Sequence, residues 1–346
     1  MRCRMAIPRV DLQKEIMQQR QLGKAGPRVS AIGLGCWNFA GPYGPTSEQE
    51  SHETLAAARD LGIDLLDTAN VYGMGVSETV IGNYLRKHPG HFRIATKAGI
   101  RVDRSTGARF FDNSPDHLRS ELEASLSRLG VDHVDLFYIH RREADRPIEE
   151  VVDTLGRFKR EGKIGGFGFS EISPASLKAA HAVAPVAAVQ SEYSLWTRQP
   201  DLGLVQACKE LGVAFVAFCP LGRGIFGQQA PDPATFGDQD FRKSNPRFTE
   251  PNLSRNIAAI SPFKDYARDI GATPVALAIA WLLARGPHVI PIPGTRSASH
   301  LTDCANGVSL KLTPAHLAEI ERILPAGFAH GGRYSGTQAI GVESYC

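Results

Sequence analysis

The sequence predicts an α/β fold, a single (β/α)8 TIM barrel. Eight short β-rich runs alternate with longer amphipathic segments from residue 30 onward, as expected of parallel strands joined by crossover helices. Several of these apolar runs finish on an ionisable side chain, and barrels keep their active sites at the carboxyl ends of their strands. No stretch of linker-like composition interrupts the alternation, which favours one closed barrel over two domains.

The expected strands are short runs rich in β-branched and aromatic residues. They cover residues 31–35, 63–67, 93–97, 134–139, 164–169, 187–190, 213–218 and 289–292. Helices are expected in the amphipathic segments between them, at residues 46–61, 76–88, 114–129, 147–161, 173–184, 200–211 and 273–285. Extra helices are expected toward the C-terminus, beyond the eight units.

Capping residues mark several of the helix boundaries. Ser114 precedes Pro115 and Ser173 precedes Pro174, so each serine can cap a helix that begins on proline. Gly130 follows another amphipathic segment, where a left-handed glycine commonly ends a helix. An open doubly wound sheet is the alternative fold. It is disfavoured because the GLGCWN sequence at the first strand lacks the third glycine of the dinucleotide-binding fingerprint.

Four segments lie outside the repeated unit. Residues 1–18 contain several arginines and no apolar core, so we expect a flexible N-terminal extension ahead of one domain at 19–346. Residues 19–30 are expected to form a short hairpin that leads into the first strand. Residues 222–252 form a long loop after the seventh strand, on the catalytic rim of a barrel. Residues 325–346 form a tail rich in Gly, Ser and Tyr.

The composition argues against several classes of protein. The 346 residues have a formal net charge of +3 with dispersed basic residues, which does not indicate a nucleic-acid partner. No apolar stretch approaches the roughly 20 residues that span a bilayer. The six cysteines include no CxxC and no ligand-like spacing, so neither a metal site nor a disulfide framework is expected. Free cysteines are typical of a reducing compartment, so we expect a cytoplasmic location.

Four polar residues could carry the chemistry at the rim. Asp67, Lys97 and His140 each end an apolar run, and Tyr72 lies in the turn that follows Asp67. Carbonyl reduction needs a proton donor and a cradle for developing negative charge. We expect Tyr72 to donate the proton, with its pKa lowered by the Lys97 ammonium, which Asp67 keeps charged. His140 could donate a hydrogen bond to the carbonyl oxygen.

Each of these residues also has an ordinary structural interpretation. Asp67 could cap the next helix, and Tyr72 could be a packing residue. Lys97 could be solvated, and His140 could be a structural residue with its hydrogen bonds satisfied. Lys97 could alternatively form a Schiff base in a barrel aldolase, although the neighbouring Asp67 would keep the amine charged. The convergence of four such residues on one rim favours a reductase site.

Successive motifs resemble those of the aldo-keto reductase superfamily. They are DTANVYGMGVSE, IATKAG, LFYIHR, GFGFSE, VQSEYSLWTR, PLGRG and IPGTR, in the order of that family and over residues 20 to 325. The details look closest to the bacterial, plant and yeast branch that includes pyridoxal-reductase-like enzymes. By this resemblance Asp67, Tyr72, Lys97 and His140 are the catalytic tetrad, and Tyr72 is the general acid.

The resemblance also implies that NADP(H) binds across the barrel mouth. Ser170 and Gln190 match residues that bind the nicotinamide amide, Phe218 matches the aromatic that stacks on its ring, and Arg296 suits the 2′-phosphate. The expected cofactor-binding residues are Cys36, Trp37, Asp67, Ser170, Gln190, Phe218, Cys219, Leu221, Gly222, Arg223, Gly294, Thr295, Arg296, His300 and Asp303. Leu221, Gly222 and Arg223 lie where loop backbone approaches the pyrophosphate.

This chain departs from the family pattern at several of these positions. Glu171 stands where an amide-binding Asn is common, so that role is not assigned to it. After IPGTR, relatives commonly have a basic residue, then Glu and Asn. This chain has His300, Asp303 and Cys304 at those three positions. Binding at the adenine end is therefore expected to be weaker or less selective than in relatives.

The substrate pocket is expected to be aromatic. Its expected lining residues are Trp37, Phe39, Tyr72, His140, Tyr193 and Trp196, with contributions from loops 99–114 and 222–252. The segment 101–112 contains three arginines, which indicate either a solvated loop or a preference for an anionic substrate.

The sequence therefore predicts NADPH-dependent reduction of a small-molecule aldehyde or ketone to an alcohol. Its alternative is a nucleotide-sensing regulatory subunit with little turnover, since the superfamily includes cytosolic β subunits of potassium channels. The sequence names neither the carbonyl compound nor the oligomeric state, which could be a monomer or a homo-oligomer.

Overall fold

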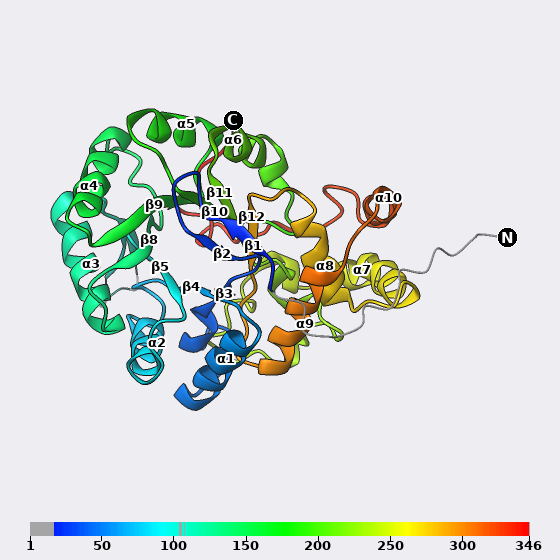
Figure 1. Ribbon diagram of the computed structural model, residues 1–346. Coiled ribbons are helices and arrows are strands. Elements are labelled where there is room, and N and C mark those ends of the chain that lie inside the picture. Colours follow the sequence, from blue (N-terminus) through cyan, green and yellow to red (C-terminus); the bar gives the residue numbers. More distant parts are fainter. Residues whose placement is uncertain (1–16, 104–105, 107, 346) are drawn as a thin grey trace.

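The computed structural model describes residues 17–103, 106 and 108–345 and contains an eight-stranded parallel barrel (Figure 1). In spatial order the strands are β3 (Leu34–Gly35), β4 (Leu65–Asp67), β5 (Arg93–Ala98), β8 (Val134–Ile139), β9 (Ile164–Ser170), β10 (Ala188–Glu192), β11 (Ala214–Phe218) and β12 (Val289–Ile292). Each one overlaps a run expected from the sequence. The (β/α)8 prediction is confirmed.

The barrel closes between its first and last strands through few bonds. The amide of Gly33 donates to the carbonyl of Pro291 at 2.9 Å, and the amide of Gly35 donates to that of Pro293 at 3.0 Å. Neither proline has an N–H to donate in return. A Cβ at Gly35 would lie 3.0 Å from the Ile292 carbonyl oxygen, so a larger residue would force the strands of this seam slightly apart.

Helices surround the strands (Figure 1). They are α1 (Glu48–Asp60), α2 (Val76–Lys87), α3 (Pro115–Leu129), α4 (Ile148–Arg160), α5 (Pro174–Val183), α6 (Leu204–Leu211), α7 (Asn252–Asp269), α8 (Pro274–Leu283), α9 (Ala298–Ser309) and α10 (Pro314–Ile323). The predicted serine caps are present, because Ser114 and Ser173 accept hydrogen bonds from the backbone amides of His117 and Ser176. Helix α7 is not among the helices expected individually, since Pro262 lies inside it.

The core has two layers, one on each side of the strands. The outer layer packs strand residues such as Phe137 against helix residues such as Leu155. The inner layer fills the barrel with Leu65, Ala95, Leu136, Tyr138, Ala188, Val216 and Ile290. Leu22 and Val29 join this inner layer from the N-terminal hairpin of β1 (Gln19–Gln21) and β2 (Arg28–Ser30). The predicted hairpin therefore plugs the amino-terminal end of the barrel.

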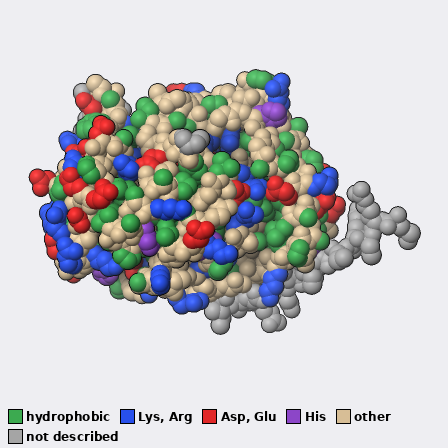
Figure 2. Space-filling model, turned by 90° about the horizontal axis from the view of Figure 1, so that it is seen from above, with side chains coloured by type: hydrophobic (Ala, Val, Ile, Leu, Met, Phe, Trp, Pro, Cys, Tyr) green, Lys and Arg blue, Asp and Glu red, His purple; other side chains and the backbone are tan. Residues whose placement is uncertain are grey.

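The opposite end carries the irregular segments. They include the hairpin of β6 (Ile100–Val102) and β7 (Arg109–Phe111), the long loop after β11, and the C-terminal tail. Three short 3-10 turns organise the long loop: η3 (Gly222–Gly224), η4 (Pro233–Thr235) and η5 (Pro246–Phe248). Two others, η1 (Cys36–Ala40) and η2 (Gln199–Asp201), lie outside it. Basic and acidic side chains are interspersed on the face seen in Figure 2.

Residues 1–16 of the predicted extension at 1–18 lie outside the described residues. Met17 packs against the outer core, and the side-chain amide of Gln18 donates to the Val308 carbonyl at 3.3 Å. No helix of the described residues has both the length and the hydropathy needed to cross a membrane.

Candidate active site

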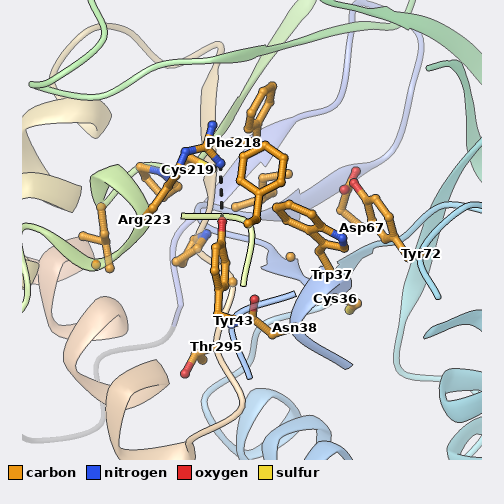
Figure 3. Close-up of a pocket in the computed structure, with 18 of the residues that line it drawn as sticks. Cys36, Trp37, Asn38, Tyr43, Asp67, Tyr72, Phe218, Cys219, Arg223 and Thr295 are labelled. Atoms are coloured by element: carbon orange, nitrogen blue, oxygen red, sulfur yellow. Dashed lines mark hydrogen bonds between the residues drawn. The ribbon is translucent and has the colours of Figure 1, made fainter. Parts of the chain in front are cut away.

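A cavity of about 750 Å³ opens at the carboxyl ends of the barrel strands. The last residue or the residue just after most strands lines it: Gly35, Asp67, His140, Ser170, Phe218 and Ile292. Trp37 lies inside the cavity beside Tyr72 and Asp67, with Arg223 at the far side (Figure 3). Polar groups of different strands therefore meet in one space, as the strand-end pattern predicted.

Lys97 is the buried centre of this site. Its side chain is wholly inaccessible to solvent, and Nζ donates to the Asp67 carboxylate, to the Thr68 carbonyl at 2.8 Å and to the Tyr72 hydroxyl at 3.4 Å. The second Asp67 oxygen accepts from the side-chain amide of Gln190 at 2.7 Å. Burial lowers the pKa of Lys97, and Asp67 opposes that shift. The ammonium is thus fixed in position by its acceptors.

Tyr72 holds its phenol between two other rings of the cavity. Its ring centroid lies 5.9 Å from that of Trp37 and 5.8 Å from that of His140. Burial raises the pKa of Tyr72 well above 10, and the Asp67 charge adds to the shift. The expectation of a lowered pKa for Tyr72 is wrong for this arrangement, because burial and the Asp67 carboxylate raise it. The phenol therefore keeps its proton near neutral pH, as a general acid must.

His140 supplies a neutral imidazole at the same end of the cavity. Burial lowers its pKa well below 6.5, and the charges of Arg141, Lys97 and Arg109 lower it further. Its Nδ1 is buried and has no hydrogen-bond partner among the described residues. A neutral ring keeps one N–H, which can donate to a carbonyl oxygen.

Three of the residues expected in the substrate pocket do not line the cavity. Phe39 is buried in the outer core. Tyr193 is also buried, donates to Asp201 at 2.5 Å and packs on Trp281. Trp196 packs against Phe248, with ring centroids 5.4 Å apart. Their side chains are buried in packing contacts with other parts of the protein, whereas Trp37, Tyr72 and His140 do line the cavity.

A model described as the aldo/keto reductase family matches residues 31–325. The chain belongs to this family. Probable aldo-keto reductase 1 of Glycine max is 38% identical over 325 residues, which are 92% of this chain and 92% of that protein. Aldo-keto reductase yakc of Schizosaccharomyces pombe is 36% identical over 311 residues, 88% of this chain and 92% of that protein.

Solved structures of the family share the barrel. The structure of a glycerol dehydrogenase from Gluconobacter oxydans has a TM-score of 0.81 and 30% identity, and covers 88% of this chain and 94% of its own. An aldo-keto reductase from Bacillus halodurans has a TM-score of 0.72 over 93% of this chain and 99% of its own. At 24% identity, that second likeness concerns the fold alone.

In this aldo/keto reductase, the cavity extends from the tetrad to the residues expected at the cofactor. All of them line it except Gly222: Cys36, Trp37, Asp67, Ser170, Gln190, Phe218, Cys219, Leu221, Arg223, Gly294, Thr295, Arg296, His300 and Asp303. Gly222 is buried with φ of 55°. A Cβ there would lie 2.7 Å from the Trp196 ring, so packing explains this glycine.

Arg223 makes structural contacts that the sequence did not predict. Its nearly buried guanidinium forms an ion pair with Glu192 at 2.8 Å and donates to the Tyr43 hydroxyl at 3.3 Å (Figure 3). It also lies over the rings of Phe241 and Tyr334, at 4.9 and 5.3 Å from their centroids. In this reductase, Arg223 thereby connects the turn after β11 with the long loop and the C-terminal tail.

Glu171 is occupied by protein partners, in agreement with leaving it out of the amide-binding set. Its carboxylate accepts from Arg333, from the Ser191 hydroxyl at 3.1 Å and from the Glu192 amide at 2.8 Å. Burial raises the pKa of Glu171, but Arg333, Arg141 and the Glu192 amide together bring it below its usual value. Glu171 thus anchors the C-terminal tail next to the cavity.

Sequence reasoning missed several residues that line the cavity. They are Tyr43, Arg141, Phe241, Arg242, Tyr334 and Gln338. Arg141 directly follows His140, so its position at a strand end was a usable signal. The others lie in the first loop, the long loop and the tail, where no periodic pattern indicates which side chains point inward.

Proposed function

We propose that this protein reduces an aldehyde or ketone to an alcohol with NADPH as the hydride donor. The observation that carries the proposal is the Tyr72 phenol, which faces the cavity with its hydroxyl 3.4 Å from a buried Lys97 that is itself paired with Asp67. An acid held beside a fixed ammonium can release its proton as negative charge develops on the substrate.

The residues divide the work of this step among them. Bound NADPH would supply a hydride to the carbonyl carbon. His140 donates a hydrogen bond to the carbonyl oxygen, and Tyr72 transfers its proton to that oxygen, which completes the alcohol. Lys97 stabilises the phenolate that remains until a proton from solvent restores it, and Asp67 and Gln190 hold Lys97 in place.

The cavity offers suitable groups at both ends of NADP(H). Ser170, Gln190 and Phe218 lie together near the tetrad, where the nicotinamide would bind. At the other end lies Arg296, whose Nη1 atom donates hydrogen bonds to the carbonyls of Gly44 and Pro45. The other nitrogens of its guanidinium make no hydrogen bond with the described residues. Its remaining nitrogens can therefore bind a phosphate. The yakc relative is named for NADP(+), which supports this choice of cofactor.

The Schiff-base alternative has an obstacle in the same geometry. Lys97 is wholly buried, does not line the cavity, and uses its ammonium on Asp67 and Thr68. A nucleophilic amine would have to lose these partners and reach a carbonyl in the cavity. The arrangement therefore favours proton transfer from Tyr72.

NADPH consumption with a panel of aldehydes tests the proposal. The panel includes pyridoxal, aromatic aldehydes and methylglyoxal, and alcohol formation is measured alongside loss of NADPH. We expect stoichiometric reduction of at least one compound. A protein that binds NADPH tightly but turns over none of them would favour the nucleotide-sensing function instead.

Exchanging Arg296 for Ala tests the cofactor assignment. The variant should raise the KM for NADPH by about tenfold or more, because a charge-assisted bond to the 2′-phosphate is lost. The KM for NADH, which lacks that phosphate, should change little. An equal response with both cofactors would remove Arg296 from the phosphate site.

A further inference from the structure

One wall of the cavity is the hairpin of β6 and β7. Ile100, Val102, Arg109 and Phe111 of this hairpin line the cavity, and Val102 pairs directly with Arg109 across the two strands. The hairpin follows the strand that carries Lys97, so its side chains border the tetrad end of the cavity. An apolar wall with one arginine is suited to an apolar substrate that has a charged group at one end.

The arginines of the cavity differ in how their charge is compensated. Arg223 is paired with Glu192 and Arg242 with Asp240, at 2.8 and 2.6 Å. Arg296 donates to backbone carbonyls. Among the described residues, the side chain of Arg109 has neither an ion pair nor a hydrogen bond, and Arg141 has no ion pair. Among the described residues, neither positive charge is therefore held in an ion pair by a carboxylate, although the charge of Arg141 acts at a distance on Glu171.

Arg109 and Arg141 also lie close to the reacting end of the cavity. Arg141 follows His140 directly, and its Nη1 atom donates to the His140 carbonyl and, at 3.2 Å, to the Ser170 hydroxyl. Its other nitrogens make no hydrogen bond with the described chain. The charges of both arginines contribute to the lowered pKa of His140, so both act at the place where the carbonyl oxygen would bind.

We propose that the substrates of this enzyme are aldehydes or ketones that carry a carboxylate, which Arg109 binds with the support of Arg141. The inference rests on the proposed reductase function and assigns its substrate class. A guanidinium binds a carboxylate through two parallel charge-assisted hydrogen bonds. The reduction itself is unchanged: hydride goes to the carbonyl carbon, the Tyr72 proton goes to its oxygen, and the carboxylate takes no part in bond making.

A matched pair of substrates tests this assignment. Para-carboxybenzaldehyde and its methyl ester present the same aldehyde with and without a negative charge. We expect the wild-type enzyme to have a higher kcat/KM for the acid, and added salt to reduce that preference. Arg109→Gln should raise the KM for the acid by about tenfold or more and leave the values for the ester nearly unchanged.

Arg101→Gln is the matched control on the same hairpin. Arg101 is paired with Asp112 at 3.0 Å and lies over the Phe110 ring, and it does not line the cavity. This variant removes the same charge, so it should keep the acid preference. Arg109→Lys should retain part of it. Equal kcat/KM values for acid and ester in the wild type, or an equal loss of both in Arg109→Gln, would overturn the proposal.

Binding separates failure of this inference from failure of the reductase function. The ligands are para-(hydroxymethyl)benzoate and its methyl ester, and the receptor is the full-length protein saturated with NADP+. Tighter binding of the acid, lost in Arg109→Gln, would support the carboxylate site even if no aldehyde were reduced. Reduction of the ester with no Arg109-dependent binding of the acid would retain the reductase and overturn the carboxylate site.

Discussion

Single residues at strand ends determine the chemistry, and Lys97 is the most constrained of them. An isolated ammonium would be very costly to bury, but each of its donors here has an acceptor in Asp67, Thr68 or Tyr72. The residue types at the strand ends were sufficient to predict that Asp67, Tyr72, Lys97 and His140 come together. The raised pKa of Tyr72 could not be predicted from them, because it depends on how deeply the folded chain buries the phenol.

Asp67→Asn should destabilise the protein strongly. The change leaves Lys97 buried without its counter-charge, and breaking a buried pair in this way costs about 3–5 kcal/mol. Urea unfolding of both proteins measures the difference in free energy. Asp265→Asn removes a carboxylate from an exposed pair with Arg268 and should cost less than about 1 kcal/mol. Similar losses in the two variants would contradict the buried-pair interpretation.

Most helices and strands could be predicted, because residues close together in the sequence specify them. Serine caps and apolar runs placed the helices that begin at Pro115 and Pro174, together with all eight strands. Helix α7 was not expected because Pro262 interrupts its pattern. Tertiary contacts support this helix, since the Asn256 amide donates to the carbonyls of Arg247 and His330 at 3.2 and 2.9 Å. His330 is 74 residues away in the sequence, so a local pattern does not reveal this contact.

Two helical glycines should respond oppositely to alanine. A Cβ at Gly82 in α2 would lie 2.2 Å from the Arg128 carbonyl oxygen of α3, whereas a Cβ at Gly156 in α4 would meet only the flexible end of Arg160 at 3.4 Å. Gly82→Ala should therefore cost about 1–3 kcal/mol through overpacking. Gly156→Ala should stabilise by about 0.5–1 kcal/mol through helix propensity. Stabilisation by both substitutions, measured by urea unfolding, would contradict the close packing of α2 on α3.

The whole molecule brings the long loop and the C-terminal tail over the barrel mouth. Arg223 from the turn after β11 and Arg333 from the tail meet Glu192 and Glu171 beneath Tyr334. Arg333 and Glu171 are 162 residues apart in the sequence. The position of the long loop after the seventh strand was enough to predict that it reaches the rim. The contacts between the loop and the tail could not be predicted, because neither segment has a periodic pattern.

Arg333→Gln should loosen the tail. The substitution leaves the Glu171 carboxylate buried without its cation, which favours a tail that moves away and admits water. Hydrogen exchange in residues 333–343 should accelerate by about tenfold or more. Arg322→Gln, at an exposed pair with Glu319, is the control and should leave this exchange unchanged. Unaltered exchange in Arg333→Gln would show that the ion pair does not hold the tail.

The kinetic effect of Tyr72→Phe tests the central claim most directly. This variant keeps the ring beside Trp37 and His140 and removes only the hydroxyl near Lys97. Loss of the general acid should lower kcat for aldehyde reduction by about 100- to 10,000-fold, while the Kd for NADPH, measured by fluorescence quenching, stays within about twofold of the wild-type value. A variant that binds NADPH normally and reduces aldehydes at the wild-type rate would contradict the assignment of Tyr72 as the proton donor.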